Sequence, residues 1–334
     1  MSRTMRSNDG WEEAKNLVKE RADLVEIVRE HVDLKRSGFR YLGSCPFHQE
    51  KTPSFTVHPD QQFYHCFGCK ASGDVFSFMM EYHQMDFREA LKNLAQRYQV
   101  ELPEKKRSAA EIEQERRRQQ MYGLNSKAAD FYHDYLLNHR DAAGARAYLA
   151  GRGIPLETQK GYRLGYAPAV ERAGWNFLGS QLSEDERRLA IEIGLLVSKE
   201  KHRNYDRFRD RILFPIYDTR GRICGFGGRI VGEGEPKYLN SPESQIYNKS
   251  RMLFGLYQQK DSIRRQRKAV LVEGNFDLLA LVAKGVDLAV APLGTALTRE
   301  QLRLLKPLVD DVILLFDGDE AGRKAAERSV PLFL

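Results

Sequence analysis

Three of the four cysteines in this 334-residue chain fall in one short segment together with a histidine, and this cluster restricts the possible folds more than any other feature. Two residues separate Cys45 from His48 and two separate Cys66 from Cys69, with 17 residues between the pairs. Two such pairs of thiolate and imidazole ligands across a hairpin-sized gap favour a tetrahedral zinc site. Because protein ligands fill all four positions, we expect a structural zinc on which the local fold depends.

The alternative is a set of free core cysteines with a chance histidine. His58 and His65 are competing ligands, but His65 is adjacent to Cys66, so its side chain is expected on the opposite face of a strand. His48 is therefore the preferred ligand. Cys224 stands alone and is predicted to be a small buried apolar residue.

Composition predicts a folded, cytosolic protein of two or three domains. Hydrophobic residues make up 42% of the chain and aromatic residues 10%, which is enough for real cores. No apolar run approaches the ~18 residues of a membrane span and the amino terminus has no apolar signal core, so no membrane partner is expected. A net charge of +7 favours a polyanionic partner.

The order of segments predicts a multidomain protein of the α+β and α/β classes. Residues 1–102 are expected to form a zinc ribbon with helices, because helical spacing covers 11–31, strand-like runs cover 41–69, and two helical patterns cover 74–82 and 86–98. 

Three further segments follow. Residues 103–120 are dense in charge, which predicts a linker or the exposed start of the next helix. Residues 121–265 are expected to form a mixed α/β basic subdomain, in which RILFPIYD and ICGFGGRIV make a hairpin around TRGR. Residues 266–334 alternate between apolar strand runs and helices, which predicts a parallel sheet with right-handed crossovers.

Four acidic residues follow two of the predicted parallel strands. Glu273 ends the run KAVLVEG, Asp277 follows one turn later, and Asp317 and Asp319 come after VDDVILLF. The carboxyl ends of such strands form a crevice, where carboxylates would repel one another unless divalent cations shared them. We therefore expect magnesium here, aligning a 3′ hydroxyl with a nucleotide phosphate. For each residue alone, the alternative is a helix N-cap.

Basic side chains alternate with other residues in NYDRFRDRILF. If this segment is extended, Arg207, Arg209 and Arg211 share one face. Further cations follow in GFGGR, PKYLNSPES and NKSR, namely Arg229, Lys237, Lys249 and Arg251. They are expected to guide a single strand or to hold an incoming triphosphate, and the alternative is solvated surface charge.

Aromatic and basic residues also surround the predicted zinc site. They are Phe47, Phe55, Phe63, Tyr64 and Phe67, with Arg36, Arg40, Lys51 and Lys70. Together they suit stacking on unpaired bases, whereas any single ring is better explained as core of the small domain.

These features, in this order, resemble the bacterial DnaG-type primases. CPFHQEKTPSFTVHPDQQFYHCFGC is similar to their zinc motif, and RFRDRILFPIYDTRGRICGFGGRI with PKYLNSPES is similar to their basic RNA-polymerase subdomain. VEGNFD and FDGDEAGRKAA are similar to their TOPRIM metal-binding motifs. The resemblance implies a three-part enzyme at the bacterial replication fork, which makes short RNA primers from ribonucleoside triphosphates on single-stranded DNA.

The resemblance also implies roles for individual residues. Glu273 would be an acid–base group or a metal ligand, and Asp317 and Asp319 would hold magnesium or manganese. The track for template and nucleotide would be lined by Arg207, Arg209, Arg229, Lys237 and Lys249.

The family pattern continues beyond the point where this chain stops, at Leu334. It adds another strand with a further acidic motif, and then a carboxy-terminal region that binds the replicative helicase. The chain shows neither, so we expect a fragment with a partial TOPRIM sheet, in which template binding survives better than primer synthesis.

Two other classes of protein combine some of these features. A recombination mediator that pairs zinc with a TOPRIM fold would bind DNA without catalysis. A topoisomerase-type enzyme would need a tyrosine nucleophile, and no tyrosine here lies in a motif that singles it out. The long basic strand region between the zinc and acidic motifs favours a primase over both.

Overall fold

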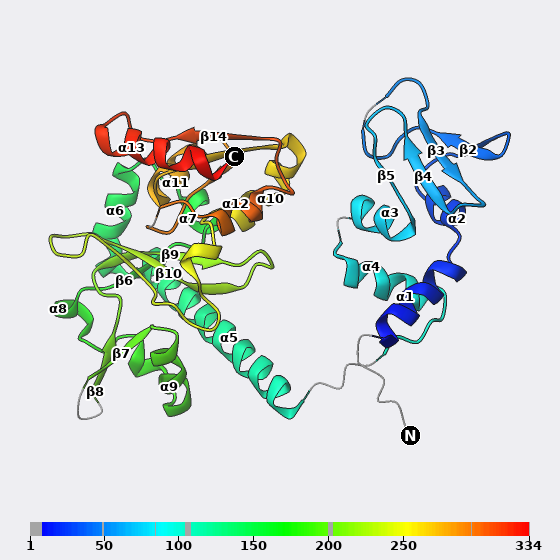
Figure 1. The fold of residues 1–334 in the computed structure, drawn as a ribbon. Helices are drawn as coiled ribbons and strands as arrows, with labels where there is room; N and C mark the ends of the chain where they lie inside the picture. Colours follow the sequence, from blue (N-terminus) through cyan, green and yellow to red (C-terminus); the bar gives the residue numbers. More distant parts are fainter. Residues whose placement is uncertain are drawn as a thin grey trace. The chain divides into compact units, whose positions relative to one another are not determined.

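The structure, a computed structural model, describes residues 9–48, 50–83, 85–103, 108–199, 203–294 and 296–333. The chain divides into two compact units, residues 1–108 and 109–334 (Figure 1). Each unit has its own hydrophobic core. Within the described residues, no helix combines the length and apolar character needed to cross a bilayer.

The first unit is a five-stranded antiparallel sheet with four helices. The strands, which neighbour one another in chain order, are β1 (Lys35–Ser37), β2 (Arg40–Gly43), β3 (Phe55–His58), β4 (Phe63–Cys66) and β5 (Ser72–Gly73). The helices are α1 (Asp9–Arg21), α2 (Leu24–Arg29), α3 (Val75–Tyr82) and α4 (Phe87–Arg97). Phe55 and Tyr64 of the sheet and Phe78 of α3 are completely buried and pack together.

Aspartates define where these helices begin. Asp74 and Asp86 cap α3 and α4, so both helices expected after the zinc motif are present. The single helical run expected over 11–31 is instead two helices, α1 and α2. The chain breaks there because the Asp23 carboxylate accepts the backbone N–H of Val25 at 2.8 Å and starts a new helix.

The second unit begins with α5 (Ala109–Asn138), which packs against β6 and β10 of a four-stranded antiparallel sheet. The sheet order is β11 (Tyr238–Asn240), β10 (Ile223–Ile230), β9 (Arg211–Tyr217) and β6 (Gly165–Ala167). The predicted hairpin is confirmed, since β9 and β10 pair antiparallel with Pro215 opposite Phe226.

Residues 109–120, which lie in the expected linker, form the first turns of α5. Arg118 pairs with Glu115 at 2.5 Å along the helix, and Arg117 pairs with Glu192 of a neighbouring helix. These ion pairs explain how a segment with so few apolar residues stays helical. Of the two interpretations of the charged segment, the start of a helix therefore applies to residues 109–120.

The last part of the second unit is a three-stranded parallel sheet, as predicted. Its order is β13 (Ala289–Val290), β12 (Lys268–Val272) and β14 (Asp311–Leu315), with helices α11 (Asn275–Ala283), α12 (Arg299–Leu305) and α13 (Glu320–Ser329). β12 and β14 are neighbours, and Val272 lies opposite Leu315. This register brings the residues that follow the two strands to the same sheet edge.

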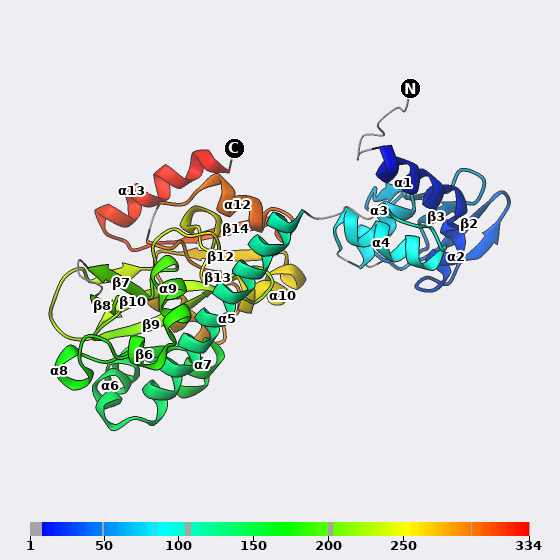
Figure 2. The same cartoon turned by 90° about the horizontal axis from the view of Figure 1, so that it is seen from below.

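The four-stranded and three-stranded sheets occupy separate parts of the unit (Figure 2). Residues 196–199 and 203–206 form a further, two-stranded antiparallel sheet. These two strands and the remaining elements of the unit are short. They are α6 (Ala143–Gly151), α7 (Leu156–Gly161), α8 (Val170–Ala173), α9 (Glu184–Glu192), β7 (Leu196–Lys199), β8 (Arg203–Asp206), α10 (Leu256–Gln266) and the 3-10 helices η1 (Arg140–Ala142), η2 (Gly179–Gln181), η4 (Lys249–Arg251) and η5 (Val330–Leu332).

Candidate metal centres and nucleic-acid interface

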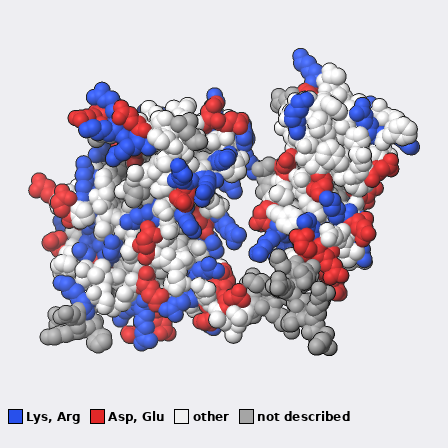
Figure 3. Space-filling view, viewed as in Figure 1, with Lys and Arg blue, Asp and Glu red and all other residues white. Residues whose placement is uncertain are grey.

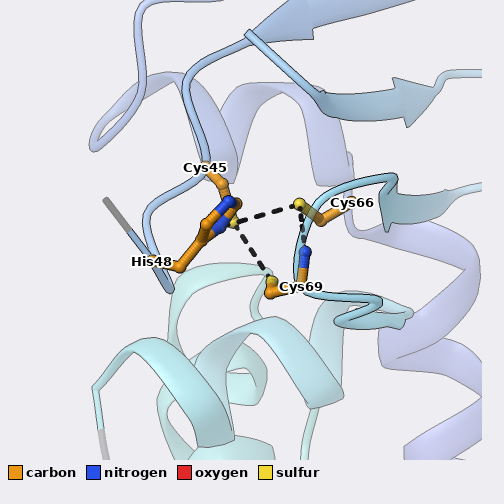
Figure 4. Close-up of side chains that lie close together, drawn as sticks. All are labelled: Cys45, His48, Cys66 and Cys69. Carbon is orange, nitrogen blue, oxygen red and sulfur yellow. Dashed lines mark hydrogen bonds between the residues drawn. The ribbon is translucent and has the colours of Figure 1, made fainter. Parts of the chain in front are cut away.

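The four predicted zinc ligands converge in the first unit (Figure 4). Cys45 and His48 come from the loop after β2, whereas Cys66 and Cys69 come from the end of β4 and the turn that follows. Their ligand atoms all lie within 4.8 Å of one another. Among the described residues, this is the single group of three or more Cys, His, Asp or Glu side chains close enough to share one ion.

The spacing of the ligand atoms fits a tetrahedral zinc ion. The sulfur atoms of Cys45 and Cys69 are 3.7 Å apart, and His48 Nδ1 is 3.8 Å from Cys66 Sγ. With Zn–S near 2.3 Å and Zn–N near 2.1 Å, a tetrahedron requires S···S of about 3.8 Å and S···N of about 3.6 Å. The residues present therefore fit zinc, and His48 would use Nδ1.

Glu50 contacts two of the four ligand residues and helps to hold them in place, a role that the sequence analysis missed. Its carboxylate accepts the Cys45 amide at 2.7 Å and the Ser54 hydroxyl at 2.5 Å. It also lies 3.3 Å from His48 Nε2, whereas Nδ1 is the ring nitrogen near Cys66 Sγ. A carboxylate at this position fixes the ring orientation and makes the other nitrogen a better ligand.

The two buried thiols differ in pKa. Burial raises the pKa of Cys45 to about 12, so a cation is needed to keep it a thiolate at neutral pH. Burial also acts to raise the pKa of Cys66, but hydrogen bonds from the Ser54 hydroxyl and the Cys69 amide outweigh it and lower that pKa to about 7.

Gly68 is required by the position of the histidine. A Cβ atom at residue 68 would lie 2.6 Å from His48 Nε2, which is closer than two such atoms can approach. The glycine in CFGC therefore makes room for the histidine of the other pair.

The aromatic patch around the zinc site divides into core and surface. Phe55 and Tyr64 are core residues and Phe47 is partly buried, in agreement with the interpretation of single rings as core of the small domain. Phe63 and Phe67 are exposed, and the Arg40 guanidinium lies 5.9 Å from the Phe67 ring centroid. The most exposed ring of the described residues is one that we did not predict, Phe39 at 93% exposure in the β1–β2 turn.

In the second unit, the predicted acidic residues meet at one edge of the parallel sheet. Glu273 follows β12, and its Oε1 accepts the backbone N–H of Asp317, which follows β14, at 2.8 Å. Asp319 is the N-cap of α13, where it accepts the Gly322 amide at 2.8 Å. A Cβ atom at residue 322 would lie 2.7 Å from Glu273 Oε1, so a glycine there allows α13 to approach Glu273.

Asp277 lies in the first turn of α11, within electrostatic range of Asp317 and Glu273. Burial raises its pKa, Asp317 and Glu273 add to the rise, and Arg152 opposes it. Mutual repulsion of this kind is what hard divalent cations relieve, and oxygen ligands suit them. Carboxylate oxygens suit a divalent metal chemically, but among the described residues these carboxylates do not lie close enough together to share one ion as they stand.

A row of alternating cations and aromatic rings, which we call the Arg–Tyr ladder, leads away from this edge. The Arg152 guanidinium lies 5.4 Å from the Tyr148 ring, and Arg229 lies 5.9 Å from Tyr148 and 5.2 Å from Tyr238. Arg152, Tyr148 and Tyr238 were not predicted as site residues. Only the packing of α6 near α11 brings Arg152 close to Asp277, so no local pattern could have indicated it.

The prediction that Arg207, Arg209 and Arg211 share one face of an extended segment is wrong, because the segment is not one continuous strand. β8 ends at Asp206 and β9 begins at Arg211, and Asp210 between them has a positive φ of 48°. Arg211 is 5% exposed and donates to the Pro236 carbonyl at 2.7 Å, so this predicted nucleic-acid contact is occupied within the fold. Arg207 is half-buried and donates to the Asn240 carbonyl at 3.2 Å.

Arg209, which is partly buried and donates to the carbonyls of Asp206 and Arg207, is part of a partly exposed cluster that we call the tryptophan platform. Its guanidinium lies 5.1 Å from the ring of Trp175 and 5.1 Å from the ring of Tyr205. Trp175 is 59% exposed, and Lys199 lies 5.7 Å from Tyr205. A cation beside an exposed indole is suited to stacking on an unpaired base. The sequence offered little to indicate this cluster: Trp175 is one of the two tryptophans of the chain, and it follows a glycine.

The other predicted cations differ in exposure. Lys237 is exposed, whereas Arg229 and Lys249 are partly buried. Positive and negative side chains are interspersed over both units in the view of Figure 3, so net charge alone does not identify a binding surface.

Comparison with known proteins agrees with this arrangement. Residues 11–110 match the CHC2 zinc finger family, residues 131–260 match the N-terminal domain of the DNA primase catalytic core, and residues 270–333 match the Toprim-like family. The DNA primase of Pseudomonas aeruginosa is 43% identical over 314 residues, which is 93% of this chain and 47% of that protein. The chain thus spans about half the length of the curated relatives it matches.

Two solved structures are similar in both sequence and fold. The zinc-binding and RNA polymerase domains of the Aquifex aeolicus primase are 38% identical with a TM-score of 0.60, covering 96% of this chain and 76% of that one. A DnaG primase catalytic domain bound to single-stranded DNA is 39% identical with a TM-score of 0.60, covering 66% and 70%. With the zinc ribbon, the α/β core and the parallel sheet in the same order, this chain belongs to the DnaG family of DNA primases.

Proposed function

We propose that this chain carries the template-binding and nucleotidyl-transfer parts of an enzyme that synthesises short RNA primers on single-stranded DNA. The observation that carries the proposal is the acidic edge of the parallel sheet, where Glu273 contacts Asp317 and the Arg–Tyr ladder begins beside Asp277. Carboxylates that can hold a divalent cation, next to arginines that can hold phosphates, are the elements that nucleotidyl transfer needs.

Glu273, Asp277, Asp317 and Asp319 would hold magnesium or manganese, which would neutralise phosphate charge and favour the 3′ hydroxyl as a nucleophile. The Glu273 carboxylate accepts a hydrogen bond from the Asp317 amide, and this bond holds the loops after β12 and β14 together without a cation. Arg152 and Arg229, supported by flanking tyrosine rings, would contact the triphosphate of a ribonucleotide.

The template would run over the tryptophan platform and the cations Arg207, Lys237 and Lys249. Related primases have been solved with single-stranded DNA and with double-stranded DNA, which supports DNA as the ligand of this fold. The zinc ribbon would contribute its exposed rings to template recognition. The RNA primer is the proposed product, and the replicative helicase is a proposed partner of the full-length protein at the replication fork.

The test incubates the full-length gene product that contains residues 1–334 with a single-stranded template, the four ribonucleoside triphosphates and magnesium. Short labelled RNA that requires both template and magnesium is the expected product. DNA binding without any RNA product would contradict primer synthesis and favour the non-catalytic recombination mediator. Cleavage of the DNA strand would instead favour a topoisomerase-type activity.

Replacing Trp175 by alanine is expected to weaken binding of single-stranded DNA by about 5- to 150-fold, because stacking contributes about 1–3 kcal/mol per base. Fluorescence anisotropy of a labelled oligonucleotide measures the effect. Trp175→Phe keeps a ring beside Arg209 and should retain most of the affinity. Equal affinities for Trp175→Ala and the unmodified protein would remove the tryptophan platform from the template path.

A further inference from the structure

In the loop Asn248–Met252, which includes η4, the backbone is held by hydrogen bonds whereas the basic side chains are not paired with acidic groups of the described residues. Its backbone is bonded at nearly every residue: the Lys249 amide donates to Glu243 Oε1 at 3.0 Å, and the Ser250 amide donates to Asn248 Oδ1 at 3.1 Å. Within the part of the chain that the structure describes, the side chains of Lys249 and Arg251 make no ion pair. The loop is therefore a fixed support for two available cations.

Helix α12, which lies some 50 residues further along the chain, supplies the remaining bonds. Gln301 Nε2 donates to the carbonyls of Lys249 and Met252, both at 2.9 Å, and Thr298 Oγ1 donates to the Ser250 carbonyl at 2.6 Å. Gln301 is 0% exposed, although it is polar. A buried amide is tolerated only when its hydrogen bonds are satisfied, and here both of its hydrogens are used on this one loop.

The oxygen of the same amide has a separate role. Gln301 Oε1 accepts the Thr298 amide at 3.0 Å, which completes a capping box at the start of α12. Glutamate serves equally well as the acceptor in a capping box but cannot donate to two carbonyls when ionised. The replacement Gln301→Glu therefore separates the helix cap from the contact with the loop.

We propose that Gln301, with Thr298, is a positioning residue that holds the loop Asn248–Met252 so that Lys249 and Arg251 meet a bound phosphate with their backbone already ordered. The inference rests on the proposed function, because it assumes that these cations contact the phosphates of DNA or of a nucleotide. A loop without this support would have to be ordered on each binding event, which lowers affinity.

The experiment measures binding of a labelled single-stranded oligonucleotide and, separately, of a fluorescent ATP analogue, which distinguishes the two sources of phosphate. Four proteins are compared with the unmodified one: Gln301→Glu, Lys249→Ala/Arg251→Ala, all three replacements together, and Gln259→Glu. Gln259 is a matched control, because it is also a buried glutamine, 4% exposed, but it bonds Tyr162 rather than the loop. Thermal unfolding of each variant checks that it is folded, and Gln301→Leu replaces Gln301→Glu if the glutamate variant is not.

Gln301→Glu is expected to lose about tenfold in affinity for the ligand that Lys249→Ala/Arg251→Ala also loses. The triple variant should be no weaker than Lys249→Ala/Arg251→Ala, because the support matters only through the two cations. Gln259→Glu should bind normally. Losses that add in the triple variant, or a Gln301→Glu affinity equal to that of Gln259→Glu, would overturn the inference while leaving the role of Lys249 intact. Full affinity in Lys249→Ala/Arg251→Ala would overturn the inference as well, whereas absence of DNA binding by the unmodified protein would count against the proposed function itself.

Discussion

Replacing Cys66 by serine is expected to release the zinc ion and to unfold the ribbon over residues 40–75. A structural zinc contributes about 10–16 kcal/mol to folding in small domains, which matches or exceeds the whole stability of a typical domain. Cys66 is completely buried, and its ligand atom belongs to the one described group of Cys, His, Asp and Glu side chains that can share an ion. Zinc content should fall from about one per chain to near zero, and amide protons in this segment should lose protection from exchange. Residues 109–334 have a separate core and should stay folded.

The matched control is Cys224→Ser, which changes the fourth cysteine of the chain. Cys224 is also completely buried, but it lies in β10 of the second unit. This variant should keep its zinc. His65→Ala should keep zinc as well, since His65 contacts the Phe67 ring rather than the ligand group. Unchanged zinc stoichiometry in Cys66→Ser would contradict the assignment of the four ligands.

The features that sequence analysis predicted well are those that depend on local spacing or on strand order. Zinc requires four ligands at a fixed distance, so Cys45, His48, Cys66 and Cys69 could be paired from their spacing alone. The acidic edge followed from topology, because parallel strands joined by right-handed crossovers place their carboxyl ends together. Neither prediction needed knowledge of how the sheets pack.

The features that were missed or wrong depend on tertiary packing. Arg211 was expected beside Arg209, but the chain bends between β8 and β9, and the alternation that would align the two side chains is lost. Trp175 and Arg209 meet only because the segment before η2 folds onto β8, where the Asp206 carboxylate accepts the Leu178 amide at 2.6 Å. Burial raises the pKa of this Asp206 to about 6, and nothing in the residues around it predicts that environment.

Replacing Asp317 by alanine is expected to abolish divalent-metal binding at the acidic edge and to lower the rate of primer synthesis by about 10³-fold. A catalytic cation supplies several kcal/mol of charge stabilisation, and each 1.4 kcal/mol is about a factor of ten in rate. Asp317 is exposed, and the contact with Glu273 uses its backbone amide, so the variant should keep its fold. Manganese titration followed by electron paramagnetic resonance measures the affinity, and initial rates with the full-length protein measure the synthesis.

The control lies at the opposite end of the same strand. Asp311 begins β14, is also exposed and pairs with Lys268 at 3.8 Å, so Asp311→Ala removes the same charge far from the acidic edge. It should bind manganese and make primers at the normal rate. If Asp317→Ala binds manganese as tightly as Asp311→Ala does, Asp317 is not a metal ligand. If both variants lose activity equally, the loss reflects overall negative charge or stability, and the acidic edge is not the place where the cation acts.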